Sequence, residues 1–261
     1  MDILTTICAQ KAVEIAAKKK LIPQAYLEQA PMFGRACHSL KANLLSAPNG
    51  IIAEFKRRSP SKDVINQKAK VDAVANAYEQ AGAAGMSVLT DGPFFGGSLD
   101  DLLQARAATS LPILRKDFMI DPYQLYEAKA YGADVILLIA ACLSVSECNN
   151  LASEAKKLGL EVLLEVHNLE ELQQYATPDV DIIGVNNRNL KTFEVSLENS
   201  KNLAQHIPDR FVKISESGIS SITAINELSQ YGFKGYLLGE NFMKTNAPGI
   251  AAAEFIKKLK S

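Results

Sequence analysis

The sequence predicts a (β/α)8 barrel, also called a TIM barrel, preceded by a helical extension. Eight short apolar runs recur along the chain, and their starts lie roughly 20 to 35 residues apart, the length of one βα unit. The runs are continuous in Val, Ile and Leu rather than alternating, which is typical of parallel strands buried on both faces. A chain of 261 residues suits one such domain, since these barrels typically take about 250 residues.

The first part of the chain precedes the barrel, and we expect residues 1–48 to form the extension and residues 49–261 the barrel of a single domain. Residues 4–20 have apolar side chains at helical spacing and end in three lysines, a pattern that predicts an amphipathic helix with cations at its C-terminus. Pro23 and Pro31 interrupt the segment that follows. We therefore expect two or three helices that cover the bottom or the mouth of the barrel.

The strands and helices of the barrel follow in order along the chain. We expect strands at residues 51–55, 86–90, 112–116, 134–139, 161–166, 182–186, 211–216 and 235–239. Helices are expected at residues 71–83, 98–108, from 121 onward, 144–158, 168–175, 196–206, 220–231 and 247–259. Ser98 is a candidate N-cap, Pro122 suits a first helical position, and Gly159 ends a helix.

Composition excludes several classes of protein. The hydrophobic content is 48% and the formal net charge is −1, which is ordinary for a globular domain and favours neither a nucleic-acid surface nor a membrane surface. No apolar stretch reaches the roughly 20 residues that span a bilayer, and residues 1–10 lack the basic start of a signal peptide. The four cysteines form no C-x-x-C pair, and the three histidines have no zinc spacing. We expect a cytoplasmic protein with reduced thiols and no metal.

Charged side chains gather where the predicted strands end, and such barrels have their active sites at that face. Glu54 and Lys56 follow the first strand and share one face because side chains alternate along a strand. Lys116 ends the third strand, where apolar walls and a second cation would lower its pKa and make it a general acid. Schiff-base chemistry is a competing use of Lys116, and a solvated salt bridge is the structural alternative for Lys56.

The fifth and sixth strands add a carboxylate, an amide and a guanidinium. Glu165 lies between apolar residues, so burial would raise its pKa toward the range of a general base, and an ion pair with Lys116 is the structural alternative. His167 follows on the same face, and we interpret it as a helix-entry or loop histidine. Asn186 and Arg188 share a face and would orient hydroxyls and an anion.

The last two strand ends carry an anion signal. Ser217 and Gly218 follow the seventh strand, and Gly239 and Glu240 follow the eighth. Barrel phosphate sites are commonly built from these two loops, with backbone N–H groups that point at the anion. Glycine allows the backbone to approach closely, although a glycine turn without a ligand is the structural alternative.

Together these segments resemble the indole-3-glycerol phosphate synthase family, which closes the indole ring with loss of CO2 in tryptophan biosynthesis. The resemblance covers nearly the whole chain, including the extension, and it depends on the combination of stretches rather than on any single one. The matching stretches are residues 52–62, 89–91, 94–98, 111–118, 163–167, 184–188 and 215–219.

The resemblance implies a small phosphorylated substrate, 1-(2-carboxyphenylamino)-1-deoxyribulose 5-phosphate, which is converted to indole-3-glycerol phosphate, CO2 and water. It implies no cofactor and no metal. By this resemblance Lys116 is the general acid that activates the ribulose carbonyl, and Glu165 is its acid/base partner. Lys56 holds the substrate carboxylate and helps to trigger its loss, while Glu54 and Asn186 orient the sugar hydroxyls.

The resemblance also implies which residues surround the substrate. Two phenylalanines would pack on its aromatic ring, and the phosphate would lie on backbone N–H groups. The implied substrate-binding residues are Ser59, Phe94, Phe118, Arg188, Glu216 and Ser217. The implied phosphate-binding residues are Gly218, Gly239 and Glu240.

The chain departs from the family pattern at two places. Asp63 stands where the family usually has glycine, so a βα loop loses backbone freedom and gains a negative charge near the mouth. Asn241 and Phe242 stand where small residues are usual, behind the expected phosphate site. Neither departure changes a residue of the implied chemistry.

Other interpretations lie close to this one. A second phosphate-binding barrel of the same pathway, such as phosphoribosyl anthranilate isomerase or the tryptophan synthase α subunit, lacks the combination of Glu54, Lys56, Lys116 and Glu165. An inactive scaffold would not need charged residues at several strand ends. We expect a monomer that binds no nucleic acid and no membrane, and contact with other enzymes of the tryptophan pathway is left open.

Overall fold

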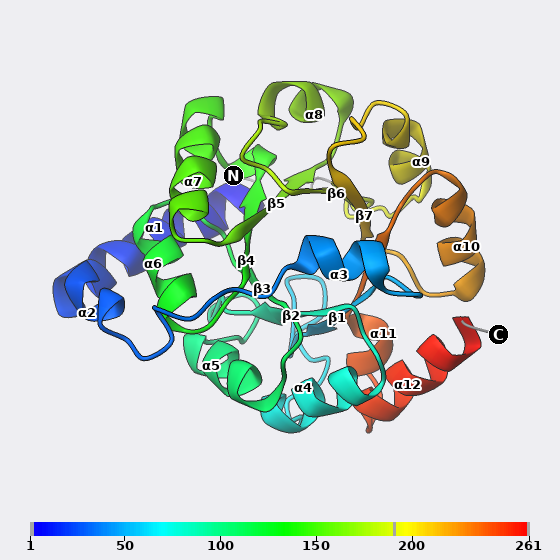
Figure 1. The fold of residues 1–261 in the computed structure, drawn as a ribbon, viewed down its shortest axis with the longest axis horizontal. Coiled ribbons are helices and arrows are strands. Elements are labelled where there is room, and N and C mark those ends of the chain that lie inside the picture. The colour runs from blue at the N-terminus through cyan, green and yellow to red at the C-terminus, as the bar shows by residue number, and fades with distance from the viewer. Residues whose placement is uncertain (1–2, 190–191, 260–261) are drawn as a thin grey trace.

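The computed structural model describes residues 3–189 and 192–259, and its centre is a closed barrel of eight parallel strands (Figure 1). Each strand pairs with its neighbour in the sequence, and β8 pairs with β1, so the sheet has no open edge. The strands are β1 (Ile51–Phe55), β2 (Gly85–Leu89), β3 (Ile113–Lys116), β4 (Val135–Ile139), β5 (Glu161–Val166), β6 (Ile182–Asn186), β7 (Val212–Glu216) and β8 (Gly235–Leu238). The predicted (β/α)8 barrel is confirmed.

Helices surround the strand ring and begin where local chemistry favours them. The side chain of Ser98 accepts a hydrogen bond from the N–H of Asp101, and Ser144 forms a capping box with Glu147. Gly159 has a φ of 74°, a left-handed conformation that ends its helix. The helices are α4 (Val71–Gln80), α5 (Leu99–Ala108), α6 (Tyr123–Ala130), α7 (Val145–Lys157), α8 (Leu169–Tyr175), α9 (Glu198–Ala204), α10 (Ile222–Gln230), α11 (Glu240–Met243) and α12 (Pro248–Leu259), with a 3-10 turn at Ala140–Cys142.

The N-terminal extension, which the sequence predicted, covers both ends of the barrel. It consists of α1 (Ile3–Leu21), α2 (Gln24–Glu28) and α3 (Leu40–Ser46). Helix α3 lies across the strand ring in Figure 1, and its Leu40 and Leu44 pack into the interior at the starts of the strands. The start of α1 lies at the opposite end, where it lines the main cavity.

The apolar core has two layers. One layer fills the space between the strands and the surrounding helices, and the other fills the inside of the barrel. Interior residues such as Ile52, Leu114 and Leu163 are fully buried, and each such side chain contributes roughly 1.5–3 kcal/mol through burial. This packed interior forms a rigid floor on which the charged strand ends stand.

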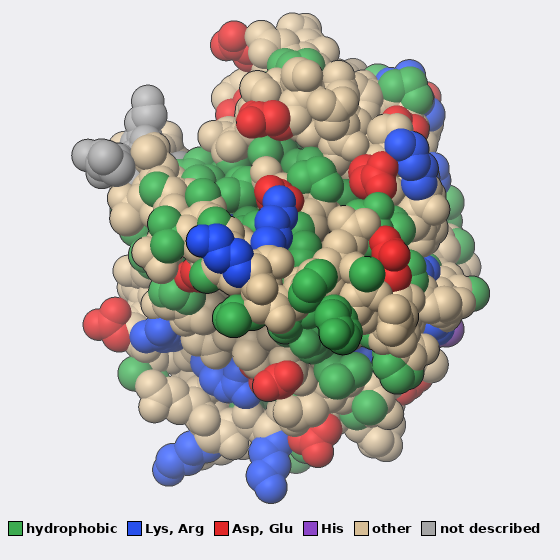
Figure 2. Space-filling view, turned by 90° about the vertical axis from the view of Figure 1, so that its left-hand side faces the viewer, with side chains coloured by type: hydrophobic (Ala, Val, Ile, Leu, Met, Phe, Trp, Pro, Cys, Tyr) green, Lys and Arg blue, Asp and Glu red, His purple; other side chains and the backbone are tan. Residues whose placement is uncertain are grey.

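Part of the outer surface is apolar. Val13, Leu21 and Tyr26 of α1 and α2 are exposed, and Figure 2 shows hydrophobic side chains gathering over the middle of the face on that side. Within residues 3–189 and 192–259, no helix is long and apolar enough to cross a membrane. Residues 1–2 and 260–261, the ends of the expected domain, lie outside the described residues.

Candidate active site

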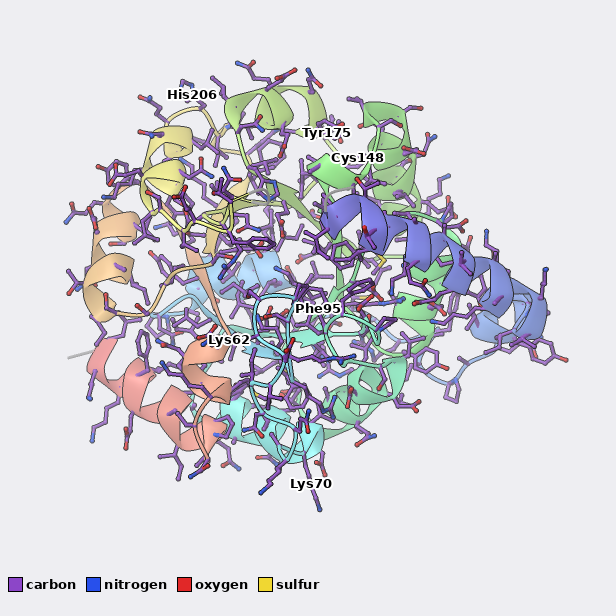
Figure 3. All side chains as sticks on the ribbon, turned by 180° about the vertical axis from the view of Figure 1, so that it is seen from behind. Lys62, Lys70, Phe95, Cys148, Tyr175 and His206 are labelled. Atoms are coloured by element: carbon purple, nitrogen blue, oxygen red, sulfur yellow. The ribbon has the colours of Figure 1, made fainter. Side chains whose placement is uncertain are left out.

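A cavity of about 460 Å³ opens at the carboxyl ends of the strands. Its floor is charged, one wall is apolar, and the loops after β1, β7 and β8 form its rim. Figure 3 shows this end of the molecule, with Phe95 near the centre, Lys62 on one side of it and α1 on the other. The cavity contains all but one of the predicted site residues: Glu54, Lys56, Ser59, Lys116, Phe118, Glu165, Asn186, Arg188, Glu216, Ser217, Gly218, Gly239 and Glu240.

Lys116 lies at the centre of the charged floor. Its ammonium contacts the carboxylate of Glu216 directly and lies 3.7 Å from Glu165 Oε2. Burial alone would lower the pKa of Lys116, but Glu216, Glu165 and Glu54 together hold it above its usual value. The expectation of a lowered lysine pKa is therefore wrong for this arrangement, because three carboxylates rather than a second cation face the ammonium.

Glu216 has a raised pKa, which is the property that the sequence predicted for Glu165. Burial, with repulsion from Glu165 and Glu54, raises the pKa of Glu216 to about 7 even though Lys116 opposes the change. The side chain is 1% exposed, and its Oε1 has no hydrogen-bond partner among the described residues. A buried carboxyl that lines the cavity and has a raised pKa is suited to exchange protons with a bound substrate.

Glu54 and Lys56 form an ion pair beside this centre. Lys56 Nζ lies 2.6 Å from Glu54 Oε1, and the glutamate is buried whereas the lysine is partly exposed to the cavity. Burial opposes ionisation of Glu54, yet Lys56 and Lys116 hold its pKa below the usual value. The missing side chain of Gly239 makes room for this pair, since a Cβ there would lie 2.6 Å from Glu54 Oε1.

Glu165 is held by neighbours on both sides. Asn186 donates from Nδ2 to Glu165 Oε1 at 2.9 Å, and His167 Nε2 lies 3.4 Å from the same oxygen. His167 follows β5 at the entry to α8, where its pKa is raised because bonding and charge from Glu171 and Glu165 outweigh burial. The interpretation of His167 as a helix-entry residue agrees with this position.

The aromatic wall corrects one predicted residue. Phe95, rather than Phe94, lines the cavity, and its ring centre lies 5.9 Å from that of Phe118. Both phenylalanines lie in an irregular loop after β2, where the two-residue alternation of a strand does not apply. The sequence therefore could not tell which of the two rings faces inward.

The predicted anion site includes the turn after β7, which has a strained backbone. Ser217 and Gly218 have φ values of 66° and 77°, and both residues line the cavity. Buried Asn187 holds this turn by donating from Nδ2 to Ser217 O at 3.1 Å and to Ser215 Oγ at 2.9 Å. A left-handed serine costs of order 1–3 kcal/mol and persists only where surrounding structure imposes it.

The residues that depart from the family pattern lie around this end. Phe242 is buried between Tyr78 and Phe255, with ring centres 6.0 and 5.7 Å away, so it anchors α11 to its neighbours. Asn241 donates from Nδ2 to Ser220 O at 3.0 Å and ties α11 to the turn after β7. Asp63 is exposed in the loop after β1.

Two features of the site were not found from the sequence. Gly184 faces Glu216, and a Cβ there would lie 2.5 Å from Glu216 Oε1. Lys62 in the loop after β1 pairs with Glu240 across the rim of the cavity. A glycine within a buried strand was an available signal for the first, whereas the second joins residues far apart in the chain.

The closed barrel and the cluster of one lysine with three glutamates at its strand ends define the class of the protein, a (β/α)8-barrel enzyme. The indole-3-glycerol phosphate synthase family model matches residues 4–255. The indole-3-glycerol phosphate synthase of Bacteroides thetaiotaomicron is 49% identical over 258 residues, covering 99% of each chain. That of Azoarcus sp. is 44% identical over 255 residues, covering 95% of this chain and 96% of the relative.

The chain belongs to the indole-3-glycerol phosphate synthase family. It is thus a decarboxylating carbon–carbon lyase of tryptophan biosynthesis that acts on a small phosphorylated substrate. Among solved structures, a chain of the Pyrococcus furiosus tryptophan synthase a2b2 complex superposes with a TM-score of 0.60 at 15% identity, covering 81% of this chain and 97% of that one. The 3-hexulose-6-phosphate synthase of Salmonella typhimurium gives 0.62 at 10% identity, covering 80% and 98%. These two likenesses concern the fold alone.

Proposed function

We propose that the cavity binds 1-(2-carboxyphenylamino)-1-deoxyribulose 5-phosphate with its phosphate at the turn after β7 and its aromatic ring against Phe95 and Phe118. The observation that carries this proposal is the convergence of Lys116, Glu54, Glu165 and Glu216 on the floor between those two ends. A substrate held at both ends would place its ribulose carbon atoms over these charges.

Lys116 is the general acid of ring closure in this proposal. Closure makes the carbonyl oxygen of the ribulose more basic as the new carbon–carbon bond forms, and an ammonium within reach donates its proton at that moment. The three surrounding carboxylates keep Lys116 protonated until the carbonyl arrives. Asn186 holds Glu165 through a 2.9 Å hydrogen bond, which supports Glu165 as the base that receives protons afterwards.

Lys56 binds the carboxylate of the aromatic ring and promotes its loss as CO2. The partial exposure of Lys56 to the cavity supports this role, since its ammonium can exchange Glu54 for the incoming carboxylate. Glu54 Oε1 is then available to a sugar hydroxyl. Ser59 and Arg188 on the rim orient the remainder of the substrate.

The phosphate lies on backbone N–H groups of Ser217, Gly218, Gly239 and Glu240. The left-handed pair at Ser217 and Gly218 supports this placement, because successive turn amides form a concave anion site. Gly239 also makes room for Glu54, because it has no side chain. Replacement of Gly239 would therefore disturb the acid cluster as well as the anion site.

We further propose that residues 1–48 and 49–261 act as one domain, and that the chain works as a cytoplasmic monomer, with contact to other enzymes of the pathway left open. The test of the function is turnover of the carboxyphenylamino-deoxyribulose phosphate by the purified chain. Formation of an indole supports the proposal, and folded chain that binds this substrate without turnover would favour the scaffold interpretation instead.

A further inference from the structure

Lys11 of α1 is a buried lysine that joins the extension to two strand ends. Its ammonium lies 2.9 Å from Asp91 Oδ2 after β2 and 3.0 Å from Asp117 Oδ1 after β3, and 3.2 Å from Glu14 on its own helix. The Lys11 side chain is only 6% exposed. Removal of a lysine from water costs several kcal/mol unless its partners compensate, and here three carboxylates surround the ammonium.

The two carboxylates that hold Lys11 also hold the aromatic wall. Asp91 Oδ1 accepts hydrogen bonds from the N–H groups of Phe94 at 2.8 Å and Phe95 at 3.2 Å. Asp117 Oδ1 accepts one from the N–H of Phe118 at 2.9 Å. The ammonium of Lys11 therefore bridges the two loops that carry the neighbouring rings of Phe95 and Phe118, which are tilted by 41° to each other.

The same face of α1 completes this wall. Ile3 and Ile7 line the cavity, and they precede Lys11 at four-residue steps, which places all three side chains along one stripe of the helix. In Figure 3, α1 passes beside the loop that carries Phe95. A shift of Lys11 would move Ile7 and the two loops together.

We propose that Lys11 is a positioning residue that sets the affinity of the cavity for the aromatic part of the substrate. It touches no reacting atom and acts through Asp91 and Asp117, which fix Phe95 and Phe118. The inference rests on the proposed placement of the aromatic ring. One carbon of the ring reacts, but the apolar contacts of Phe95 and Phe118 are made to the rest of the ring and already exist in the ground state, so their loss raises KM more than it lowers kcat.

The test compares Lys11→Met with the matched control Lys18→Met. Lys18 lies on the same helix and also pairs with a buried carboxylate of the barrel, Glu127 at 3.1 Å, away from the cavity. For Lys11→Met we expect KM to rise about tenfold or more with kcat within about threefold. For Lys18→Met we expect both constants to stay within about twofold of the parent.

A double variant keeps the proposal testable if K11M alone folds poorly. K11M leaves Asp91 without its cation, whereas Asp117 retains Arg115 and the hydroxyl of Thr90. K11M/D91N removes that unpaired charge and keeps an oxygen that accepts from Phe94 and Phe95. We expect the double variant to melt at a higher temperature than K11M yet to keep the raised KM, because the bridge between the two loops is still missing.

Three results would overturn the proposal. A parental KM in folded K11M would give Lys11 a role in stability alone. An equal rise of KM in K18M would assign the effect to general docking of α1. A KM that falls back to the parental value in K11M/D91N would make the unpaired Asp91 charge, rather than the lost bridge, the cause. Absence of turnover in the unsubstituted chain would instead count against the proposed function.

Discussion

At the scale of single residues, the chemistry of the site depends on which buried carboxylate lies nearest to Lys116. The sequence identified Lys116 and Glu165 as a pair, but the structure places Glu216 in direct contact with Lys116 and Glu165 farther off, at 3.7 Å. Which carboxylate across the barrel lies nearest depends on the tilt and stagger of the strands. Strand ends alone do not reveal that geometry.

Lys116→Met tests the general acid. Methionine keeps the length of the side chain and removes its proton, and a positioned general acid contributes roughly 10²–10⁴ in rate. We expect at least about a 10²-fold loss of kcat with KM nearly unchanged, because the proton is needed only in the transition state. Steady-state kinetics with circular dichroism as a folding check would measure this.

Lys56→Met is the matched comparison, since its ammonium also holds the ground-state carboxylate. We expect KM to rise together with a fall in kcat. If Lys116→Met kept a parental kcat while Lys56→Met lost it, the acid would have been assigned to the wrong lysine.

Glu216→Gln tests the raised pKa through stability. The pKa of Glu216 is raised from its usual 4.5 to about 7 in the folded chain, so the folded state holds this proton more tightly than the unfolded state does. Its contribution to stability is fully present below about pH 4.5 and is lost as pH rises through about 7. We expect Glu216→Gln to gain stability relative to the parent between pH 5 and pH 8.

Urea unfolding of both proteins at several pH values measures that difference. A difference in unfolding free energy that stayed constant from pH 5 to pH 8 would contradict the assignment. The control is Glu198→Gln, because that side chain is largely exposed on α9 and far less of its surface is desolvated.

At the scale of elements, the sequence predicted the barrel well and its loops poorly. Three strands, β1, β5 and β6, have the predicted bounds, because continuous Val, Ile and Leu runs bounded by polar residues leave little choice of register. The inward Phe95 was missed because the loop after β2 has no periodicity. Nothing in the sequence singled out Lys11, since its partners Asp91 and Asp117 lie far along the chain.

Gly218→Ala tests the turn after β7, with Gly232→Ala as its control. Both glycines have left-handed φ values, 77° and 85°, so alanine strains both. A Cβ at Gly218, which lines the cavity, would lie 2.2 Å from Val195 Cγ1, whereas at Gly232 the nearest atom is 3.6 Å away. We expect only Gly218→Ala to raise KM and to weaken binding of inorganic phosphate.

Isothermal titration with inorganic phosphate separates affinity from catalysis, and thermal melts report the strain at each position. Equal phosphate affinity in both variants and the parent would place the anion site elsewhere in the cavity.

At the scale of the whole molecule, the extension packs against both ends of the barrel. Helix α3 closes the bottom of the barrel while α1 reaches the mouth. Composition and the spacing of the apolar runs were enough to predict this architecture. The reaction was predicted from the resemblance to the indole-3-glycerol phosphate synthase family. The coupling between α1 and the aromatic wall became visible only once distant residues were placed together.

The central claim is that this charged cavity closes an indole ring, and turnover of the carboxyphenylamino-deoxyribulose phosphate tests it most directly. The chain has no tryptophan, so indole fluorescence would appear over a background from tyrosine alone. We predict a steady rise of that signal from purified chain in the presence of a chelator, and its near absence with Lys116→Met. Folded chain that gave no indole from verified substrate, or activity that depended wholly on added metal, would contradict the account.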